Sequence, residues 1–278
     1  MKITHNTRRL TVLFAIVVTA AGFSSISFSA PNDAETESGS PTVITVPAPT
    51  PETAAPAPKT LTETIEVFGR SVQKRPLRAY ILGDGENVTL IFAAVHGNET
   101  ATPYLVTQLR AHLKRHPEIL KNRRAILVPV LNPDGLQKRR RVNANGVDIN
   151  RNYPGTWRKA KRGDSFKSGP SAASEPEAQA MIRLVKKYPP DKIVSIHQPL
   201  HCLAYSGERS RALARAIAKE NGYKIKSNIG YPTPGGFGGY CDKIIKTPVV
   251  TLELPWQKPE AAWKKNATAL LAAIALEP

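Results

Sequence analysis

Four side chains suited to metal binding and proton transfer stand out in the sequence. His96 and Glu99 are three residues apart, whereas His197 and Glu253 lie far from them and from each other. Two histidines and a carboxylate are a common ligand set for a catalytic zinc, with a fourth position left open for water. A further carboxylate can act as general base toward that water. The residue types therefore indicate a hydrolytic zinc site.

Three of these positions directly follow short apolar runs, which must place them in space. The runs contain mostly Val, Ile and Leu over five to seven residues, as is typical of strands covered on both faces. We predict four strands of this kind, at 89–95, 125–131, 192–196 and 248–252. Ligands of open α/β sheets gather at the carboxyl ends of strands, so His96, His197 and Glu253 are expected to meet there.

Amphipathic stretches alternate with the predicted strands. They predict helices at 100–115, 174–188, 208–221 and 259–275. The second of these begins with Ser174 and Glu177 in capping-box spacing. Alternation of short apolar runs with helical stretches favours an α/β layer architecture.

The segment 138–153 is rich in polar and charged residues. One interpretation is a basic, solvated loop. Residues 146–153, however, mix aliphatic side chains with Asp148, Asn150 and Arg151, and such polar groups are costly to bury without partners. Paired Asn and Arg side chains can hold a substrate carboxylate, arginine through its two-pronged guanidinium. We therefore expect this segment to bind substrate.

These motifs together resemble the zinc carboxypeptidase family, in its carboxypeptidase A-like form. The resemblance covers roughly residues 61–275 and depends on His96-x-x-Glu99, Arg141-Val142-Asn143, 146–154, Ser195-Ile196-His197 and 251–254. Within the family, four further segments are most similar to the murein peptide amidase branch: 174–177, 197–202, 231–235 and Phe237-Gly238. The resemblance implies a single α/β domain with a mixed, mostly parallel twisted sheet and helices on both faces.

The resemblance also implies roles for the residues of the site. His96, Glu99 and His197 would bind one zinc ion per chain, and Glu253 would be the general base and then the acid.

Substrate contacts are implied in the same way. Arg141 would stabilise the oxyanion of the scissile carbonyl; because two arginines precede it, this assignment depends on the Arg-x-Asn spacing. Asn150 and Arg151 would hold the free carboxylate on the leaving side. Asp148 would orient His96 and raise its basicity.

The implied reaction is hydrolysis of the bond between γ-D-glutamate and meso-diaminopimelate in murein peptides, either as free peptides or within peptidoglycan. One alternative is a zinc deacylase of small N-acyl amino acids, which shares the His-x-x-Glu and the distant His. Another is a non-catalytic protein that binds the cell wall through its charge. A nucleic-acid binder is disfavoured, because the chain has no aromatic-rich binding stretch and carries an export signal.

The N-terminal region predicts export. Basic residues precede an apolar run at 10–23, and small residues follow up to position 30, which is the order of a secretory signal. Fourteen apolar residues are short for a membrane span. Residues 31–60 contain seven prolines and indicate a linker. We expect a signal peptide at 1–30, a linker at 31–60, a catalytic domain at 61–278 and a periplasmic or secreted protein without a lasting membrane span; the oligomeric state stays open.

The net charge of the chain is +17, from 39 basic and 22 acidic residues. The first 60 residues contain four of each kind, so the whole excess belongs to 61–278. A strongly basic domain indicates an acidic partner, and an exported one is suited to carboxylate-bearing wall peptides.

Two smaller features leave alternatives open. Cys202 and Cys241 are too few for a disulfide-rich scaffold, but a single disulfide between them is compatible with an oxidising compartment. The glycine-rich segment 235–239 predicts a mobile loop at the pocket, with either Phe237 or Tyr240 covering the substrate.

Overall fold

The structure is a computed structural model that describes residues 61–227 and 229–278. The predicted signal peptide, 1–30, and the predicted linker, 31–60, lie outside the described residues. Within the described part of the chain, no helix has the length and apolar character needed to cross a membrane.

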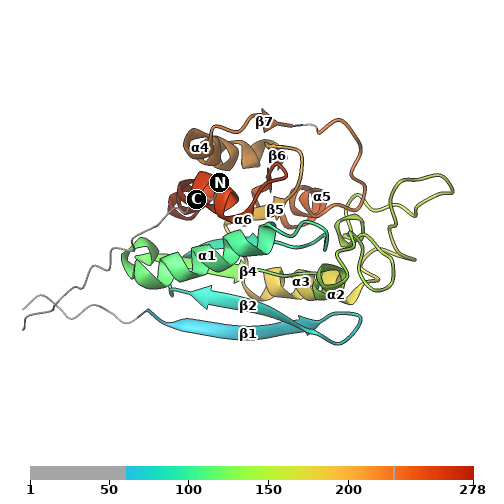
Figure 1. The fold of residues 1–278 in the computed structure, drawn as a ribbon, viewed down its shortest axis with the longest axis horizontal. Helices are drawn as coiled ribbons and strands as arrows, with labels where there is room; N and C mark the ends of the chain where they lie inside the picture. The colour runs from blue at the N-terminus through green and yellow to red at the C-terminus, as the bar shows by residue number, and fades with distance from the viewer. Residues whose placement is uncertain (1–60, 228) are drawn as a thin grey trace, which may run out of the picture. The chain divides into compact units, whose positions relative to one another are not determined.

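A single sheet of eight strands organises the described residues, in the order β1-β2-β4-β3-β5-β8-β6-β7 (Figure 1). Four of the seven pairings between neighbouring strands are parallel, so the predicted mixed, mostly parallel sheet is confirmed. The strands are β1 (Glu63–Arg70), β2 (Pro76–Leu82), β3 (Asn87–Phe92), β4 (Arg123–Val128), β5 (Lys192–His197), β6 (Cys202–Ser206), β7 (Ile225–Lys226) and β8 (Val249–Glu253).

The four central strands are the ones that the apolar runs predict. The predicted strands 89–95, 125–131, 192–196 and 248–252 correspond to β3, β4, β5 and β8, within three residues at each end. Every residue of β3 and β5 is buried, because layers of helix cover both faces there.

The helices lie on both faces of the sheet, as predicted. On one face, α1, α4 and α6 contribute Leu105, Leu213 and Leu270 to an apolar core; on the other, α3 and α5 contribute Met181 and Phe237 to a second core. The predicted helices are confirmed as α1 (Thr102–Arg115), α3 (Pro176–Lys187), α4 (Arg211–Asn221) and α6 (Pro259–Ala275). Shorter helical pieces are η1 (Pro117–Leu120), α2 (Pro133–Gln137), η2 (Ile149–Arg151), η3 (Glu208–Ser210), α5 (Phe237–Tyr240) and the π-helical η4 (Cys241–Ile245).

The capping box expected at the start of α3 does not form. The N-cap residue is Glu175, and its side chain makes no capping hydrogen bond. The Glu177 carboxylate instead accepts hydrogen bonds from the Val72 N–H and from Asn143 Nδ2, each at 3.0 Å. The prediction was wrong because the Glu177 carboxylate bonds to residues that are distant in the sequence, and local spacing does not reveal such partners.

Strand pairing brings the predicted chemical groups to one edge of the sheet. Strand β5 lies between β3 and β8, and all three run parallel. In this register His197 at the end of β5 pairs with Glu253 at the end of β8. The chain leaves β3 and reaches His96 within four residues, at the same edge.

Candidate metal centre and active site

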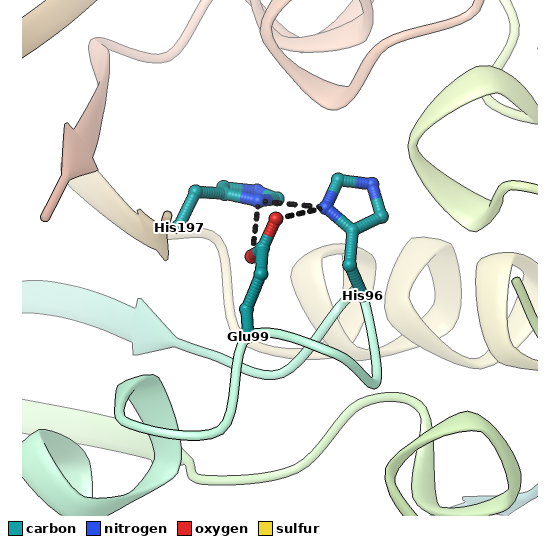
Figure 2. A group of neighbouring side chains, drawn as sticks. All are labelled: His96, Glu99 and His197. Carbon is teal, nitrogen blue, oxygen red and sulfur yellow. Dashed lines mark hydrogen bonds and ion pairs between the residues drawn. The ribbon is translucent and has the colours of Figure 1, made fainter. Parts of the chain in front are cut away.

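Three predicted ligands converge at this edge of the sheet. Figure 2 shows the His96 and His197 rings turned toward the Glu99 carboxylate. Glu99 Oε1 lies 2.5 Å from His96 Nδ1, and Glu99 Oε2 lies 2.9 Å from His197 Nδ1. The two Nδ1 atoms are 3.2 Å apart, and all three side chains are buried. One ligand atom from each residue therefore faces a common point.

The turn that carries His96 and Glu99 is held from both sides. The Glu99 N–H donates to the His96 carbonyl at 3.2 Å, and Thr102 Oγ1 donates to the Glu99 carbonyl at 2.9 Å. Gly97 packs directly on the backbone of Gly135: a Cβ at Gly97 would lie 1.9 Å from the Gly135 carbonyl carbon. Position 97 therefore excludes a side chain, and the His-Gly-Asn-Glu turn depends on that glycine.

Two carboxylates make the site strongly favourable to positive charge. Burial alone would lower the pKa of His96, but Glu99 and Asp148 outweigh it and raise that pKa to about 9. Burial alone would raise the pKa of Glu99, but His197 and His96 lower it to about 2. The pKa of Asp148 is likewise lowered, since His96 and Arg141 overcome the effect of its burial. The same field would stabilise a bound cation.

The donor set fits a zinc ion. Zinc takes imidazole nitrogen and carboxylate oxygen, and three protein ligands leave a position open. The second nitrogen of His96, Nε2, lies 3.0 Å from Asp148 Oδ1, which fixes the ring with Nδ1 toward Glu99.

Glu253 stands beside this cluster. Its side chain lines the same cavity as His96, Glu99 and His197, and the residue is 7% exposed. Burial raises its pKa. Oε2 accepts a hydrogen bond from the Leu200 N–H at 3.3 Å, so one oxygen is anchored.

Arg141 and Asp148 connect the metal side of the site to the substrate side. Arg141 Nε donates to Asp148 Oδ2 at 2.9 Å, and Arg141 Nη1 lies 4.0 Å from Glu99 Oε1. Of the three consecutive arginines, only Arg141 is among the described residues that line the cavity. The Arg-x-Asn spacing thus selects the arginine that the structure places at the site.

Asn150 and Arg151 also line the cavity, from η2. Asn150 Oδ1 accepts from the Phe237 N–H at 2.9 Å, and Arg151 Nη1 donates to the Asn150 carbonyl at 2.7 Å. Arg151 is only 5% exposed, yet its Nε has no hydrogen-bond partner among the described residues. In the cavity wall, the Arg151 guanidinium is suited to an incoming carboxylate.

The cavity itself measures about 310 Å³. Seven of the eight predicted site residues line it, and Asp148 lies behind them. Away from the metal ligands, its wall contains the small polar residues Ser195, Ser206 and Thr251.

Gln198 is a cavity residue that sequence reasoning missed. Its Oε1 accepts from the Ala101 N–H at 3.2 Å, and its Nε2 donates to the Pro255 carbonyl at 3.1 Å. Gln198 thereby joins the segment after Glu99 to the segment after Glu253. Its position directly after His197, at the end of a predicted strand, could have indicated that Gln198 lies at the site.

A buried polar network around Asn143 was also missed. Asn143 Nδ2 donates to Glu175 at 2.7 Å and to Glu177 at 3.0 Å, while Oδ1 accepts from the Asn145 and Val147 N–H groups at 3.1 and 3.0 Å. Asn143, Glu175 and Glu177 are each at most 4% exposed. The network fixes the turn between Arg141 and Asp148 against the start of α3.

The glycine-rich segment differs from the predicted loop. Residue 237 begins α5, so only the first two glycines precede a helix. Phe237 lines the cavity, and its ring packs 4.9 Å from both Phe92 and Tyr153, whereas Tyr240 is not among the cavity-lining residues described. Phe237 is therefore a fixed wall; the exposed aromatic at the cavity is Tyr231, which is 47% exposed.

The two cysteines are free in the structure, and both are buried. The disulfide that the sequence left open is therefore not formed.

Comparisons with known proteins agree with this geometry. The family model described as zinc carboxypeptidase matches residues 52–233. Murein peptide amidase A of Escherichia coli K12 is 31% identical over 240 residues, which cover 82% of this chain and 94% of that protein. The Vibrio campbellii protein of the same name is 32% identical over 226 residues, covering 76% of this chain and 87% of its own.

Solved structures are similar to the chain as well. The crystal structure of murein-tripeptide amidase MpaA from Escherichia coli O157 is similar with a TM-score of 0.62 and 31% identity, covering 77% of this chain and 92% of that one. Carboxypeptidase A from Helicoverpa armigera has a TM-score of 0.66 at 18% identity, covering 77% and 68%. This second likeness supports the fold alone.

Proposed function

The chain belongs to the zinc carboxypeptidase family, and from that premise we propose that it hydrolyses the bond between γ-D-glutamate and meso-diaminopimelate in murein peptides. Family membership makes it a metallopeptidase or amidase. The observation that carries the finer proposal is the near-complete span of similarity to murein peptide amidases, 94% of the Escherichia coli protein. The Arg151 guanidinium in the cavity wall supports a substrate with a free carboxylate.

In this proposal His96, Glu99 and His197 hold the zinc ion. The ion, when bound, supplies a Lewis acid that polarises a carbonyl and lowers the pKa of a water molecule toward neutrality. Asp148 keeps the His96 ring oriented through Nε2.

Glu253 moves the proton. As general base it removes a proton from the attacking water, and as acid it delivers that proton to the leaving nitrogen. Burial, which raises its pKa, favours the protonated form that the second step needs. The Leu200 N–H holds Oε2, so Oε1 remains for the transfer.

Arg141 and Arg151 divide the binding of the substrate. Arg141 is half-exposed at the cavity with Nε fixed on Asp148, so its Nη groups can stabilise negative charge on the scissile carbonyl oxygen. Arg151 and Asn150 hold the carboxylate of the leaving residue. Contacts on both sides of the scissile amide, to the carbonyl oxygen and to the carboxylate of the leaving residue, place the amide next to Glu253.

Export would place this reaction in the periplasm or outside the cell. Support comes from the signal-like order of residues 1–30 and the proline-rich stretch 31–60. A net charge of +17 would attract acidic stem peptides at low ionic strength.

Mass spectrometry of L-Ala-γ-D-Glu-meso-diaminopimelate incubated with zinc-loaded protein tests the proposal. Release of free diaminopimelate is expected, and Glu253→Gln should lower turnover by about 10² to 10⁴-fold with zinc still bound. Intact sacculi and N-acyl amino acids serve as parallel substrates. Cleavage of N-acyl amino acids alone, or near-normal turnover by the variant, would contradict the proposal.

A further inference from the structure

A second hollow, of about 480 Å³, adjoins the active-site cavity. The two share Arg141, Arg151 and Tyr231 in their walls. The wall of the second hollow also contains Arg158 and Phe166, which do not line the active-site cavity and have no role in the proposed reaction. A ligand in the main cavity can therefore extend into this second hollow, here called the Arg158 pocket.

The acidic groups of the Arg158 pocket are already engaged. Asp148 accepts from His96 and Arg141 and from the Asn150 N–H. Asp164 accepts from Arg158 Nη1 and Nη2, at 2.8 and 3.2 Å, and from the Lys161 N–H at 2.6 Å. Neither carboxylate is left to attract a cation.

The donors of the Arg158 pocket are not all engaged. Arg151 Nε is buried without a hydrogen-bond partner in the described part of the chain. Arg141 uses Nε for Asp148, while its Nη1 lies 4.0 Å from the nearest carboxylate oxygen of Glu99, beyond hydrogen-bond distance. Arg141 and Arg151 also have roles in the proposed reaction, which leaves Arg158 as the arginine that belongs to this pocket alone. Among the described residues, three arginines and two aspartates line the pocket, so its wall keeps a net positive charge, which favours an anion.

The Phe166 ring gives the pocket a firm wall. Its centroid lies 4.8 Å from the Arg158 guanidinium carbon and 6.0 Å from that of Arg151. Cation–π contact holds guanidinium groups over a ring face. Together with the Asp164 pair, it fixes Arg158 in one orientation and leaves Nε of Arg158 without an assigned partner among the contacts described.

We propose that the Arg158 pocket binds a second carboxylate of the substrate and that Arg158 selects for it. This inference rests on the proposed function. The proposed tripeptide has two carboxylates besides the one assigned to Asn150 and Arg151: the α-carboxylate of the γ-linked D-glutamate and the distal carboxylate of diaminopimelate. Both offer the same chemistry to a guanidinium.

Two substrate analogues distinguish these sources. In the first, the D-glutamyl α-carboxylate is amidated to D-isoglutamine; in the second, lysine replaces diaminopimelate and removes the distal carboxylate. Affinity is measured by calorimetry on zinc-loaded Glu253→Gln protein, and kcat/KM on the protein with Glu253 intact. We expect one of the two analogues to be disfavoured by about 10-fold or more relative to the tripeptide.

Substitution of Arg158 should remove that preference. Arg158→Gln should weaken binding of the tripeptide to the level of the disfavoured analogue and leave that analogue unchanged, and Arg158→Lys should restore part of the preference. Arg162→Gln is the matched control, because Arg162 is exposed in the same segment and does not line the pocket among the residues described.

Asp164→Asn separates binding from loop support. If Arg158 only braces the segment through its ion pair, Asp164→Asn and Arg158→Gln should weaken binding alike. If Arg158 contacts the substrate, Asp164→Asn should retain the preference or increase it, since the guanidinium is released. Equal losses in both variants overturn the inference.

The remaining outcomes test the pocket and the proposed function separately. If Arg158→Gln weakens all three peptides equally, or none of them, the Arg158 pocket does not select a carboxylate. Selective binding without hydrolysis contradicts the proposed function and supports the pocket. Absence of binding to any of the peptides contradicts both.

Discussion

The two halves of the active site are constructed in different ways. The metal-facing half, with His197 and Glu253, extends from neighbouring parallel strands, and a backbone bond from the Leu254 N–H to the His197 carbonyl at 2.8 Å continues the ladder beyond them. The substrate-facing half, from Arg141 to Arg151, contains only the three-residue η2. There, side chains such as Asn143 hold the backbone.

Because of this difference, substitutions in the two halves should affect activity and stability differently. Strand ends are fixed by backbone hydrogen bonds that do not depend on the identity of the chemical side chain. A loop is fixed by particular polar side chains, each of which leaves buried partners unpaired when it is removed. Substitutions at the strand ends should therefore abolish chemistry while leaving the strand pairing intact, whereas substitutions in the loop should also loosen the backbone that carries the site.

The largest effect is expected in the metal-facing half. His96→Ala should reduce zinc to well below one ion per chain and remove detectable hydrolysis, because one of three proposed ligands is lost. Elemental analysis and the tripeptide assay measure both. His116→Ala, at a half-exposed histidine outside the site, is the control. Full zinc occupancy in His96→Ala would contradict the ligand assignment.

The next effect concerns substrate binding in the loop half. Arg151→Gln should raise KM for the tripeptide by about 10 to 100-fold, because a charge-assisted hydrogen bond to a carboxylate is lost. Zinc content should change little, whereas thermal unfolding should shift to lower temperature, because the buried Arg151 also donates from Nη1 to the Asn150 carbonyl. A change in kcat at constant KM would exclude the carboxylate role.

A smaller effect on activity, accompanied by a loss of stability, is expected at Asn143. Asn143→Ala removes one buried donor each from Glu175 and Glu177 and should lower the free energy of unfolding by about 1–3 kcal/mol. Denaturant unfolding measures it, with zinc retained. Asn145→Ala, which removes one bond to Glu175 at a more exposed position, should cost less. Equal stability of Asn143→Ala and the unaltered protein would contradict the view that polar side chains hold the loop half of the site.

The smallest effect is expected away from both halves. Glu63 on β1 accepts from Arg110 at 2.5 and 2.9 Å, and these bonds keep the pKa of Glu63 below its ordinary value. A lowered pKa in the folded state stabilises the fold above the unfolded pKa, near 4.5, and this contribution disappears as the pH falls further. Glu63→Gln should lower the free energy of unfolding by about 0.2–1 kcal/mol at pH 7 and by less at pH 3, as measured by denaturant unfolding at the two pH values. Hydrolysis of the tripeptide should be unchanged.

The sequence predicted the parts of the molecule that have local signals. Buried parallel strands read as continuous apolar runs, so β3, β4, β5 and β8 were found, and with them His96, His197 and Glu253. Strand β1 was missed because its apolar residues Ile65 and Val67 alternate with Thr64 and Glu66 and so form no continuous apolar run.

Other features depend on partners that are distant in sequence. Asn143 meets Glu175 across 32 residues, and Gln198 meets Pro255 across 57. Neither pairing leaves a periodic pattern. The failed capping box has the same origin, because Glu177 bonds to Asn143 and to the backbone of Val72.

The position of β8 has a consequence for the timing of synthesis. This strand follows β7 in the chain, yet it inserts between β5 and β6 and carries Glu253. A growing chain that ends before β8 already contains all three proposed zinc ligands, but it lacks Glu253, the proposed general base, and one of the two strands that pair with β5. If Glu253 has the proposed role, activity requires that this late strand has been synthesised and inserted between β5 and β6.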